Sequence, residues 1–288
     1  MRVTVLEAIQ KSAEFLGKKN VESPRLQTEL LLAHLLKMPR MKLYLNFDRQ
    51  LTTAETDALR ELVKRRGLRE PLQHIVGSTS FCGFEISVNR HALIPRPETE
   101  LLAELGWQYL SSLAGNPTGL DFGTGTGCLA IAVAAKCPAA KVTALDVSAE
   151  ALALAKTNAA QNKLAGRIEF FHGNGFAALP APAPTFDLIL SNPPYVASGE
   201  VETLEPEVRD FDPRTALDGG PDGLDFYRLL AREAKALLKP DGKIMLEFGD
   251  GQAGAIKEIF ERENWIVEAV KDDYSQRARI LVARASRP

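Results

Sequence analysis

The sequence predicts an α/β fold in which an N-terminal bundle of helices precedes a doubly wound, mostly parallel β-sheet. Apolar residues recur at helical spacing up to about Leu68, which indicates helices. Beyond Pro97, short apolar runs alternate with stretches long enough for helices, as in βαβ units. A length of 288 residues also suits two domains better than one. We therefore expect a helical domain over residues 1–75, a β-hairpin connector over 76–96 and an α/β domain over 97–288.

The composition is that of an ordinary globular protein, with 45% hydrophobic and 25% charged residues, which excludes disordered and collagen-like chains. The charge is uneven: residues 1–75 hold 14 Lys and Arg against 9 Asp and Glu, and the rest of the chain holds 21 against 28. A basic front part suits an acidic partner, although a solvated helical surface is an equal alternative. The acidic body lacks the clustered basic residues that grip a nucleic-acid backbone, so we expect no direct nucleic-acid binding.

Several kinds of site and segment are not expected. The longest uninterrupted apolar run, Leu129–Ala135, is far shorter than the ~18 residues of a membrane span, and the opening residues lack the apolar core of a signal peptide. The cysteines at 82, 128 and 137 form no C-x-x-C pair, and no His/Cys cluster has zinc spacing. We expect a cytoplasmic monomer with no membrane segment, disulfide or metal site.

The α/β part contains seven expected strands, over Gly119–Phe122, Lys141–Leu145, Arg167–Phe171, Phe186–Leu190, Lys243–Phe248, Trp265–Val270 and Arg279–Val282. Only a short polar segment joins the last two strands, so we expect them to form an antiparallel pair at one edge. A seven-stranded sheet with such a terminal hairpin is typical of class I S-adenosylmethionine-dependent methyltransferases, whose Rossmann-like fold this part resembles. Before it, residues 79–88 alternate polar and apolar residues around a glycine, which predicts the connecting hairpin.

A glycine-rich loop, Asp121-Phe122-Gly123-Thr124-Gly125-Thr126-Gly127, lies between the first expected strand and an apolar helix. Glycines in this turn let the backbone approach a ligand closely. The loop lacks the Gly-Lys-Ser/Thr ending of a P-loop, and its third glycine comes one residue too early for the dinucleotide pattern. We predict that it faces the amino acid and ribose of a nucleotide-like cofactor, with contacts from Gly123, Thr124, Gly125, Thr126 and Gly127. A turn that serves packing alone is the alternative.

Two further positions are candidates for cofactor binding. Asp146 ends the second expected strand, where a carboxylate can accept hydrogen bonds from both ribose hydroxyls; a helix cap is the alternative. Asn174 and Gly175 close the third strand, where methyltransferases often place an acidic or amide side chain against adenine, although Asn-Gly is also an ordinary turn.

The motif Asn192-Pro193-Pro194-Tyr195 directly follows the fourth strand. Its prolines remove two backbone donors, so carbonyl oxygens and the Asn192 side chain face the cleft as acceptors. They suit an NH₂ group: bonds to the Asn192 amide oxygen and the Pro193 carbonyl would localise the nitrogen lone pair toward a methyl donor. We predict that Tyr195 stacks on the substrate, that Pro194 also contacts it, and that Asn192 touches the cofactor as well. A turn with a surface tyrosine is the alternative.

The chain resembles the PrmC/HemK family of release-factor glutamine methyltransferases over essentially its whole length. Asn-Pro-Pro-Tyr is shared with adenine and cytosine amino-methyltransferases, so it specifies the chemistry, whereas the Arg-Pro-Glu-Thr-Glu segment is more specific to the family. The matching motifs are Gln73-His74-Ile75-Val76-Gly77, Ile94-Pro95-Arg96-Pro97-Glu98-Thr99-Glu100, Asp121 to Gly127, Asn192 to Tyr195, Glu205-Pro206-Glu207-Val208-Arg209 and Leu246-Glu247-Phe248-Gly249.

The resemblance implies N5-methylation of the glutamine side-chain amide in the Gly-Gly-Gln loop of bacterial-type peptide chain release factors, with S-adenosyl-L-methionine as cofactor. It also implies that Arg96 and Glu98 lie beside the active site, near the substrate, and that the N-terminal helical domain contacts the acidic release factor. Many members carry an acidic residue and then a bulky aromatic where this chain has Asn174-Gly175, so adenine stacking would either be weaker or be supplied by Phe176.

Two other functions stay open. A nucleic-acid amino-methyltransferase would share the cleft chemistry, but it should carry a basic recognition region near its catalytic domain. A non-catalytic cofactor-binding protein could keep the fold alone, although the complete Asn192–Tyr195 motif argues against it.

Overall fold

The computed structural model describes residues 3–286, which form two compact units. The first unit runs to Ser78 and includes the later segment Glu205–Phe211; the second contains Thr79–Leu204 and the chain from Asp212 onward. No helix within residues 3–286 is long and apolar enough to cross a membrane.

The first unit is helical. Capping boxes start two of its helices: the Thr4 hydroxyl accepts from the Glu7 N–H, and Thr52 does the same for Glu55. The buried faces supply a core rich in leucine. The helices are α1 (Val5–Lys18), α2 (Pro24–Leu35), α3 (Arg40–Tyr44), α4 (Thr53–Gly67), α5 (Leu72–Val76) and, from the later segment, α9 (Pro206–Arg209).

Ion pairs attach the later segment to this unit. The Glu207 carboxylate accepts from Arg66 Nη2 at 2.7 Å and from Arg69 Nε at 2.6 Å, and Arg69 Nη2 also donates to Glu205 at 2.8 Å. The sequence predicts a helical domain that ends at residue 75 and does not predict this addition. The partners are 136 to 141 residues apart, so no local periodicity connects them.

The expected hairpin consists of β1 (Ser78–Phe81) and β2 (Phe84–Ser87). Both residues of its two-residue turn have positive φ, as hairpins of this kind require. Phe81 and Ile86 are buried in the core of the second unit. The hairpin therefore packs as part of the α/β unit and does not form the separate connector over 76–96 that the sequence predicts.

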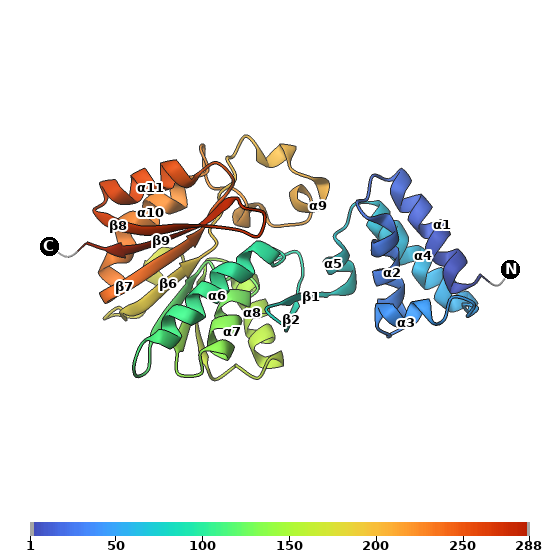
Figure 1. The fold of residues 1–288 in the computed structure, drawn as a ribbon, viewed down its shortest axis with the longest axis horizontal. Helices are drawn as coiled ribbons and strands as arrows, with labels where there is room; N and C mark the ends of the chain where they lie inside the picture. The colour runs from blue at the N-terminus through green and yellow to red at the C-terminus, as the bar shows by residue number, and fades with distance from the viewer. Residues whose placement is uncertain (1–2, 287–288) are drawn as a thin grey trace. The chain divides into compact units, whose positions relative to one another are not determined.

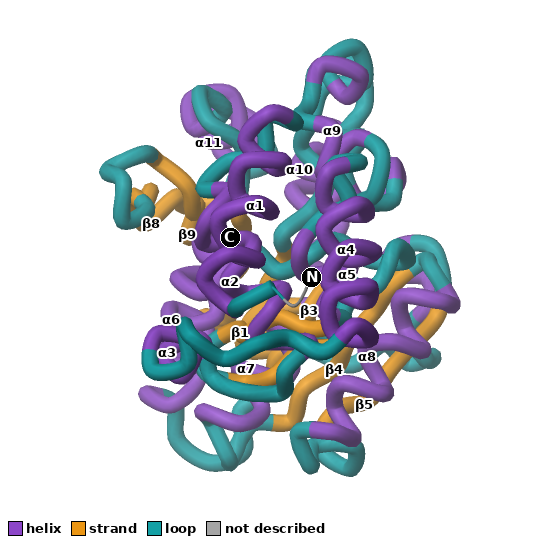
Figure 2. Tube along the Cα trace, turned by 90° about the vertical axis from the view of Figure 1, so that its right-hand side faces the viewer, coloured by secondary structure: helices purple, strands orange, loops and turns teal. Residues whose placement is uncertain are grey.

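The second unit is built on a seven-stranded sheet in the order β5-β4-β3-β6-β7-β9-β8, which confirms the predicted fold class (Figure 1). Neighbouring pairs from β5 to β7 are parallel, and β9 is antiparallel to both β7 and β8. Figure 2 shows β3, β4 and β5 side by side. The strands are β3 (Thr118–Phe122), β4 (Lys141–Asp146), β5 (Ile168–His172), β6 (Phe186–Ser191), β7 (Leu238–Glu247), β8 (Trp265–Asp272) and β9 (Ala278–Ala285).

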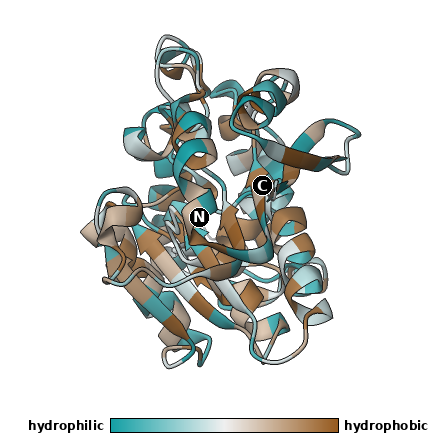
Figure 3. Ribbon diagram, turned by 90° about the vertical axis from the view of Figure 1, so that its left-hand side faces the viewer, coloured by the Kyte–Doolittle hydropathy of each residue, from teal (hydrophilic) through white to brown (hydrophobic). Residues whose placement is uncertain are grey.

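Helices cover both faces of this sheet. Leu188 and Leu190 of β6 pack into one core cluster with the helices α6, α7 and α8, whereas Ile189 packs into a second cluster with α10 and α11. Strands buried on both faces are rich in apolar residues, which appear as brown segments of the strands in Figure 3. The helices are α6 (Pro97–Ser112), α7 (Cys128–Lys136), α8 (Ala149–Gln161), α10 (Asp225–Glu233) and α11 (Ala253–Arg262).

The parallel strands end at one edge of the sheet. Phe122 of β3 pairs with Leu145 of β4, and Asp146 pairs with His172 of β5. Strand β3 lies between β4 and β6. Strands β4 and β5 follow on one side of β3, and β6 and β7 follow on the other side, so the direction in which successive strands are added reverses at β3. Open α/β sheets bind ligands at such a switch point.

Candidate active site

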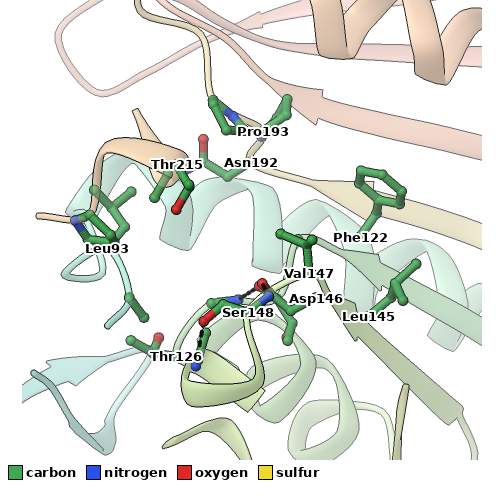
Figure 4. Close-up of a pocket in the computed structure, with 18 of the residues that line it drawn as sticks. Leu93, Phe122, Thr126, Leu145, Asp146, Val147, Ser148, Asn192, Pro193 and Thr215 are labelled. Atoms are coloured by element: carbon green, nitrogen blue, oxygen red, sulfur yellow. Dashed lines mark hydrogen bonds between the residues drawn. The ribbon is translucent and has the colours of Figure 1, made fainter. Parts of the chain in front are cut away.

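A cavity lies at this carboxyl edge of the sheet (Figure 4). Its walls come from the ends of β3, β4 and β6, the loop after β5, the segment before α6 and the chain just after residue 212. Figure 4 shows Asn192 and Pro193 across the cavity from Asp146 and Val147. The lining brings together most residues predicted for the site: Arg96, Gly123, Thr124, Gly125, Thr126, Asp146, Asn174, Gly175, Asn192, Pro193 and Pro194.

Three predicted site residues lie outside this lining: Glu98, Gly127 and Tyr195. Gly127 has φ +81°, and a Cβ there would lie 3.0 Å from the Ala155 Cβ, so this glycine allows close packing of the loop on α8. Tyr195 packs against the core on the side of α10 and α11, and its carbonyl accepts from Gln252 Nε2 at 2.9 Å. Stacking of Tyr195 on a substrate therefore stays a prediction, and in this structure the side chain does not line the cavity.

The buried Asp121 side chain hydrogen-bonds the glycine-rich loop and the first turn of α7. Its Oδ2 accepts from the Thr124 hydroxyl at 2.5 Å and from the Ala130 N–H at 3.1 Å. Burial raises the pKa of the Asp121 carboxyl to about 7, against the lowering effect of these hydrogen bonds. The side chain therefore fixes the loop and does not face the cavity.

Asp146 connects the loop to the start of α8. Its Oδ2 accepts from the Gly125 N–H at 2.8 Å, and its Oδ1 accepts from the Ser148 N–H at 2.9 Å (Figure 4). The cap of α8 is Ser148, whose hydroxyl accepts from the Ala151 N–H. A carboxylate offers about four acceptor sites, so two remain for hydroxyl groups of a ligand.

Apolar side chains beside Asp146 were not predicted from the sequence. Val147 lines the cavity although it is 58% exposed, and Phe122 lines it from the end of β3. Phe176 packs on Phe122, with ring centroids 4.8 Å apart, and lies outside the lining. The stacking role that the resemblance suggested for Phe176 therefore suits Phe122 or Val147 better. The sequence signal that could have identified Val147 is an apolar residue directly after Asp146, the acidic last residue of β4.

Asn192 presents an acceptor without a partner. Its Nδ2 donates to the Thr99 hydroxyl at 3.2 Å, whereas its Oδ1 is buried and has no hydrogen-bond partner among the residues that the structure describes. Buried polar atoms are almost always hydrogen-bonded, so an orphan at a cavity wall indicates a ligand donor. The cavity therefore carries a site for an N–H or O–H group at Asn192.

Arg96 lines the cavity and pairs with a buried carboxylate. Its Nη2 donates to Asp212 Oδ2 at 2.5 Å. Burial raises the pKa of the Asp212 carboxyl, and the Arg96 charge lowers it. Asp212 was not predicted as a site residue from the sequence; it fixes the guanidinium at the cavity wall and neutralises its charge.

Two family models match different parts of the chain. Residues 7–77 match the PrmC N-terminal domain, and residues 105–206 match the methyltransferase small domain. A solved methyltransferase from Pyrococcus furiosus is similar in fold, with a TM-score of 0.52 and 24% identity, over 70% of this chain and 88% of that one.

Relatives match over nearly the full length. The release factor glutamine methyltransferase of Geobacter sulfurreducens is 43% identical over 90% of this chain and 89% of its own. The protein of the same name from Rhodospirillum rubrum is 40% identical over 96% of this chain and 83% of its own. With that identity over both units and the methyltransferase fold around the cavity, the chain belongs to the release factor glutamine methyltransferase family.

Proposed function

We propose that this protein methylates the N5 nitrogen of a glutamine side chain in the Gly-Gly-Gln loop of peptide chain release factors, with S-adenosyl-L-methionine as methyl donor. The observation that carries the proposal is the orphan Asn192 Oδ1 beside Pro193. Asn192 lies across the cavity from Asp146, and the glycine loop lines the same cavity (Figure 4). An amide NH₂ is a donor that this acceptor suits. The same proposal takes the enzyme to act as a monomer in the cytoplasm, where translation occurs.

The residues opposite Asn192 fit S-adenosylmethionine. Gly123 and Gly125 line the cavity at positive φ, with no protein atom within 3.5 Å of where a Cβ would lie, so the backbone is open to a ligand. Asp146 keeps acceptor capacity for ribose hydroxyls, and Val147 and Phe122 offer apolar contact to adenine. When bound, the cofactor supplies an electrophilic methyl group.

The chain's own residues would activate the amide by accepting hydrogen bonds. An amide nitrogen is a poor nucleophile because its lone pair is delocalised into the carbonyl. Bonds from its two N–H groups to Asn192 Oδ1 and the Pro193 carbonyl would hold the nitrogen in one orientation, which lowers the entropic barrier. These acceptors gain strength as positive charge develops on the nitrogen, which then loses a proton to solvent. No side chain is required as a general base.

The direct test is incubation with purified release factor and labelled S-adenosylmethionine, followed by mapping of the modified residue. Label on the Gly-Gly-Gln glutamine supports the proposal. A release factor with that glutamine replaced by alanine is the matched control, and it should take up no label. Label on nucleic acid added to the same reaction, with none on the factor, would replace the proposal by an amino-methyltransferase of nucleic acid.

The Asp146→Ala variant should bind S-adenosylhomocysteine about ten- to a hundredfold more weakly, because it loses charge-assisted bonds to the ribose and the tie to Gly125. Calorimetry measures the affinity. Glu150→Ala is the control, since it removes an exposed acid from the same helix start outside the cavity lining. Equal affinity of wild type and Asp146→Ala would leave Asp146 with a structural role only.

Deleting residues 1–75 should leave binding of S-adenosylhomocysteine intact and reduce methyl transfer to release factor chiefly through KM, because the basic helical unit is proposed to dock the factor. The α/β unit has its own core. The deletion also removes Arg66 and Arg69, the partners of Glu207, so circular dichroism should accompany it.

Salt gives a second readout of docking on the intact protein. If basic residues of the helical unit steer the factor, association should slow as salt rises, because exposed charges are screened beyond ~8 Å at physiological ionic strength. A truncated enzyme with wild-type kcat/KM on release factor would show that the helical unit does not recognise the substrate.

A further inference from the structure

Two buried polar residues, one of which also lines the cavity, lie next to Asn192. Thr99 is the third residue of α6 and is 3% exposed. Glu247 is the last residue of β7 and is 1% exposed. Strand β7 pairs with β6 so that Leu246 lies beside Ser191, which places Glu247 next to the position of Asn192. Burial of an ionisable side chain at this point is costly for folding, which indicates a purpose other than core packing.

Hydrogen bonds connect the three side chains in a row. Asn192 Nδ2 donates to the Thr99 hydroxyl at 3.2 Å. The Thr99 hydroxyl also acts as a hydrogen-bond donor toward the Glu247 carboxyl, which lowers the pKa of that carboxyl. The other polar atom of the Asn192 amide, Oδ1, is buried without a hydrogen-bond partner among residues 3–286, and Asn192 itself lines the cavity. The opposite end of the row is also incomplete, since Glu247 Oε2 has no hydrogen-bond partner within the described part of the chain.

We propose that Thr99 and Glu247 are positioning residues, which fix the Asn192 amide so that its oxygen, and not its nitrogen, faces the substrate. This inference rests on the proposed methylation of a glutamine amide. An asparagine amide has two nearly isosteric orientations, and only one of them offers an acceptor to the substrate NH₂. In the reversed orientation the Asn192 NH₂ group would face the substrate NH₂ group, and two donors cannot hydrogen-bond each other.

The direction of these hydrogen bonds follows from the Thr99 hydroxyl, which has only one proton to donate. A carboxylate only accepts, so an ionised Glu247 requires Thr99 to donate its proton toward β7. The Thr99 oxygen is then left with lone pairs alone, and it can only accept from Asn192. Asn192 must therefore turn its NH₂ toward Thr99 and its Oδ1 toward the cavity. A protonated Glu247 could donate to Thr99 instead, which would free the hydroxyl proton and allow the reversed amide.

The environment of Glu247 determines the pH range in which its carboxyl is ionised and the hydrogen bonds of Thr99 and Asn192 take this direction. Burial raises the pKa of the Glu247 carboxyl to about 7; Arg279 of β9 and Arg96 lower it, and Glu98 of α6 raises it. Two tyrosines face the same group: Tyr227 of α10, whose hydroxyl donates to the Glu247 carbonyl at 2.8 Å, and Tyr195 after β6. The ionised form that orients Asn192 therefore becomes populated as pH rises through about 7.

The test compares Thr99→Val, Thr99→Ser and Glu247→Gln with wild type in full-length enzyme, with release factor as substrate. Valine has the shape of threonine and no hydroxyl, so kcat should fall about tenfold or more, while KM for the factor and the affinity for S-adenosylhomocysteine stay near wild type. Thr99→Ser keeps the hydroxyl and should restore most of kcat. In wild type, kcat should decline below about pH 7. Glu247→Gln should lower kcat and remove this decline, because its side chain does not titrate.

The outcomes separate the inference from the function on which it rests. A wild-type enzyme that does not label release factor contradicts the proposed function itself. An active wild type, together with a folded Thr99→Val variant of equal kcat, overturns the inference. If Thr99→Val does not fold, Glu247→Gln decides: wild-type kcat with an unchanged pH profile overturns the inference, and a lower kcat without the acidic decline supports it.

Discussion

Replacing Asn192 with alanine is expected to lower kcat for methyl transfer by about a hundredfold or more and to leave cofactor affinity nearly unchanged. Its Oδ1 is the buried orphan acceptor at the cavity, and it would gain strength only as charge develops on the substrate nitrogen. An interaction that strengthens in the transition state affects kcat much more than ground-state binding. The alanine variant also removes the partner of Thr99 and leaves a small void, neither of which touches the glycine loop.

Single-turnover kinetics with saturating cofactor measure this effect, and calorimetry with S-adenosylhomocysteine measures the affinity. Asn174→Ala is the matched comparison, because it removes an asparagine from the cofactor side of the same cavity. It should weaken cofactor binding and change kcat at saturation little. A folded Asn192→Ala enzyme that methylates at nearly the wild-type rate would contradict the proposed activation of the amide.

Replacing Gly223 with alanine should destabilise the protein by about 2–4 kcal/mol and also lower activity. Gly223 has φ +74°, and a Cβ there would lie 2.3 Å from the Tyr195 carbonyl oxygen and 2.8 Å from Gln252 Nε2. These two atoms hydrogen-bond each other at 2.9 Å. The backbone that carries Tyr195 must therefore shift, and the strain reaches the preceding residues, Asn192 to Pro194.

Chemical denaturation measures the free energy of unfolding. Gly199→Ala serves as the control, because its φ lies outside the positive range and no atom lies within 4 Å of its added Cβ. Equal stability and activity of Gly223→Ala and Gly199→Ala would show that this contact does not support the motif. A loss of stability with unchanged kcat would separate the fold of this loop from the chemistry.

The sheet could be predicted from the sequence because its signals are local. Each parallel strand is a short run buried on both faces, so Lys141–Asp146 and Phe186–Ser191 appear as apolar segments of strand length. The cofactor side of the cavity follows from the same logic, since Asp146 and the glycine loop are defined by their positions at strand ends. Both were predicted and both line the cavity.

The polar contacts between residues around the cavity could not be predicted from local sequence signals. Thr99 and Asn192 are 93 residues apart, and Arg96 and Asp212 are 116 apart. A single polar residue in α6 or in a loop carries no periodicity that identifies its partner. The place of Tyr195 could not be predicted for a related reason: proximity in sequence to Asn192 does not determine which way a side chain turns after two prolines.

The two carboxylates under the glycine loop bear on how a cofactor would bind. Asp121 holds Thr124 and Ala130, and Asp146 holds the Gly125 N–H. Glycine loses more conformational entropy on ordering than any other residue, so a loop with three glycines would otherwise weaken any ligand that had to order it. Because these hydrogen bonds form when the α/β unit folds, the loop has already lost this entropy before a ligand binds. Cofactor affinity then reflects contacts alone, and the loop is preorganised for a small ligand that must be exchanged after every turnover.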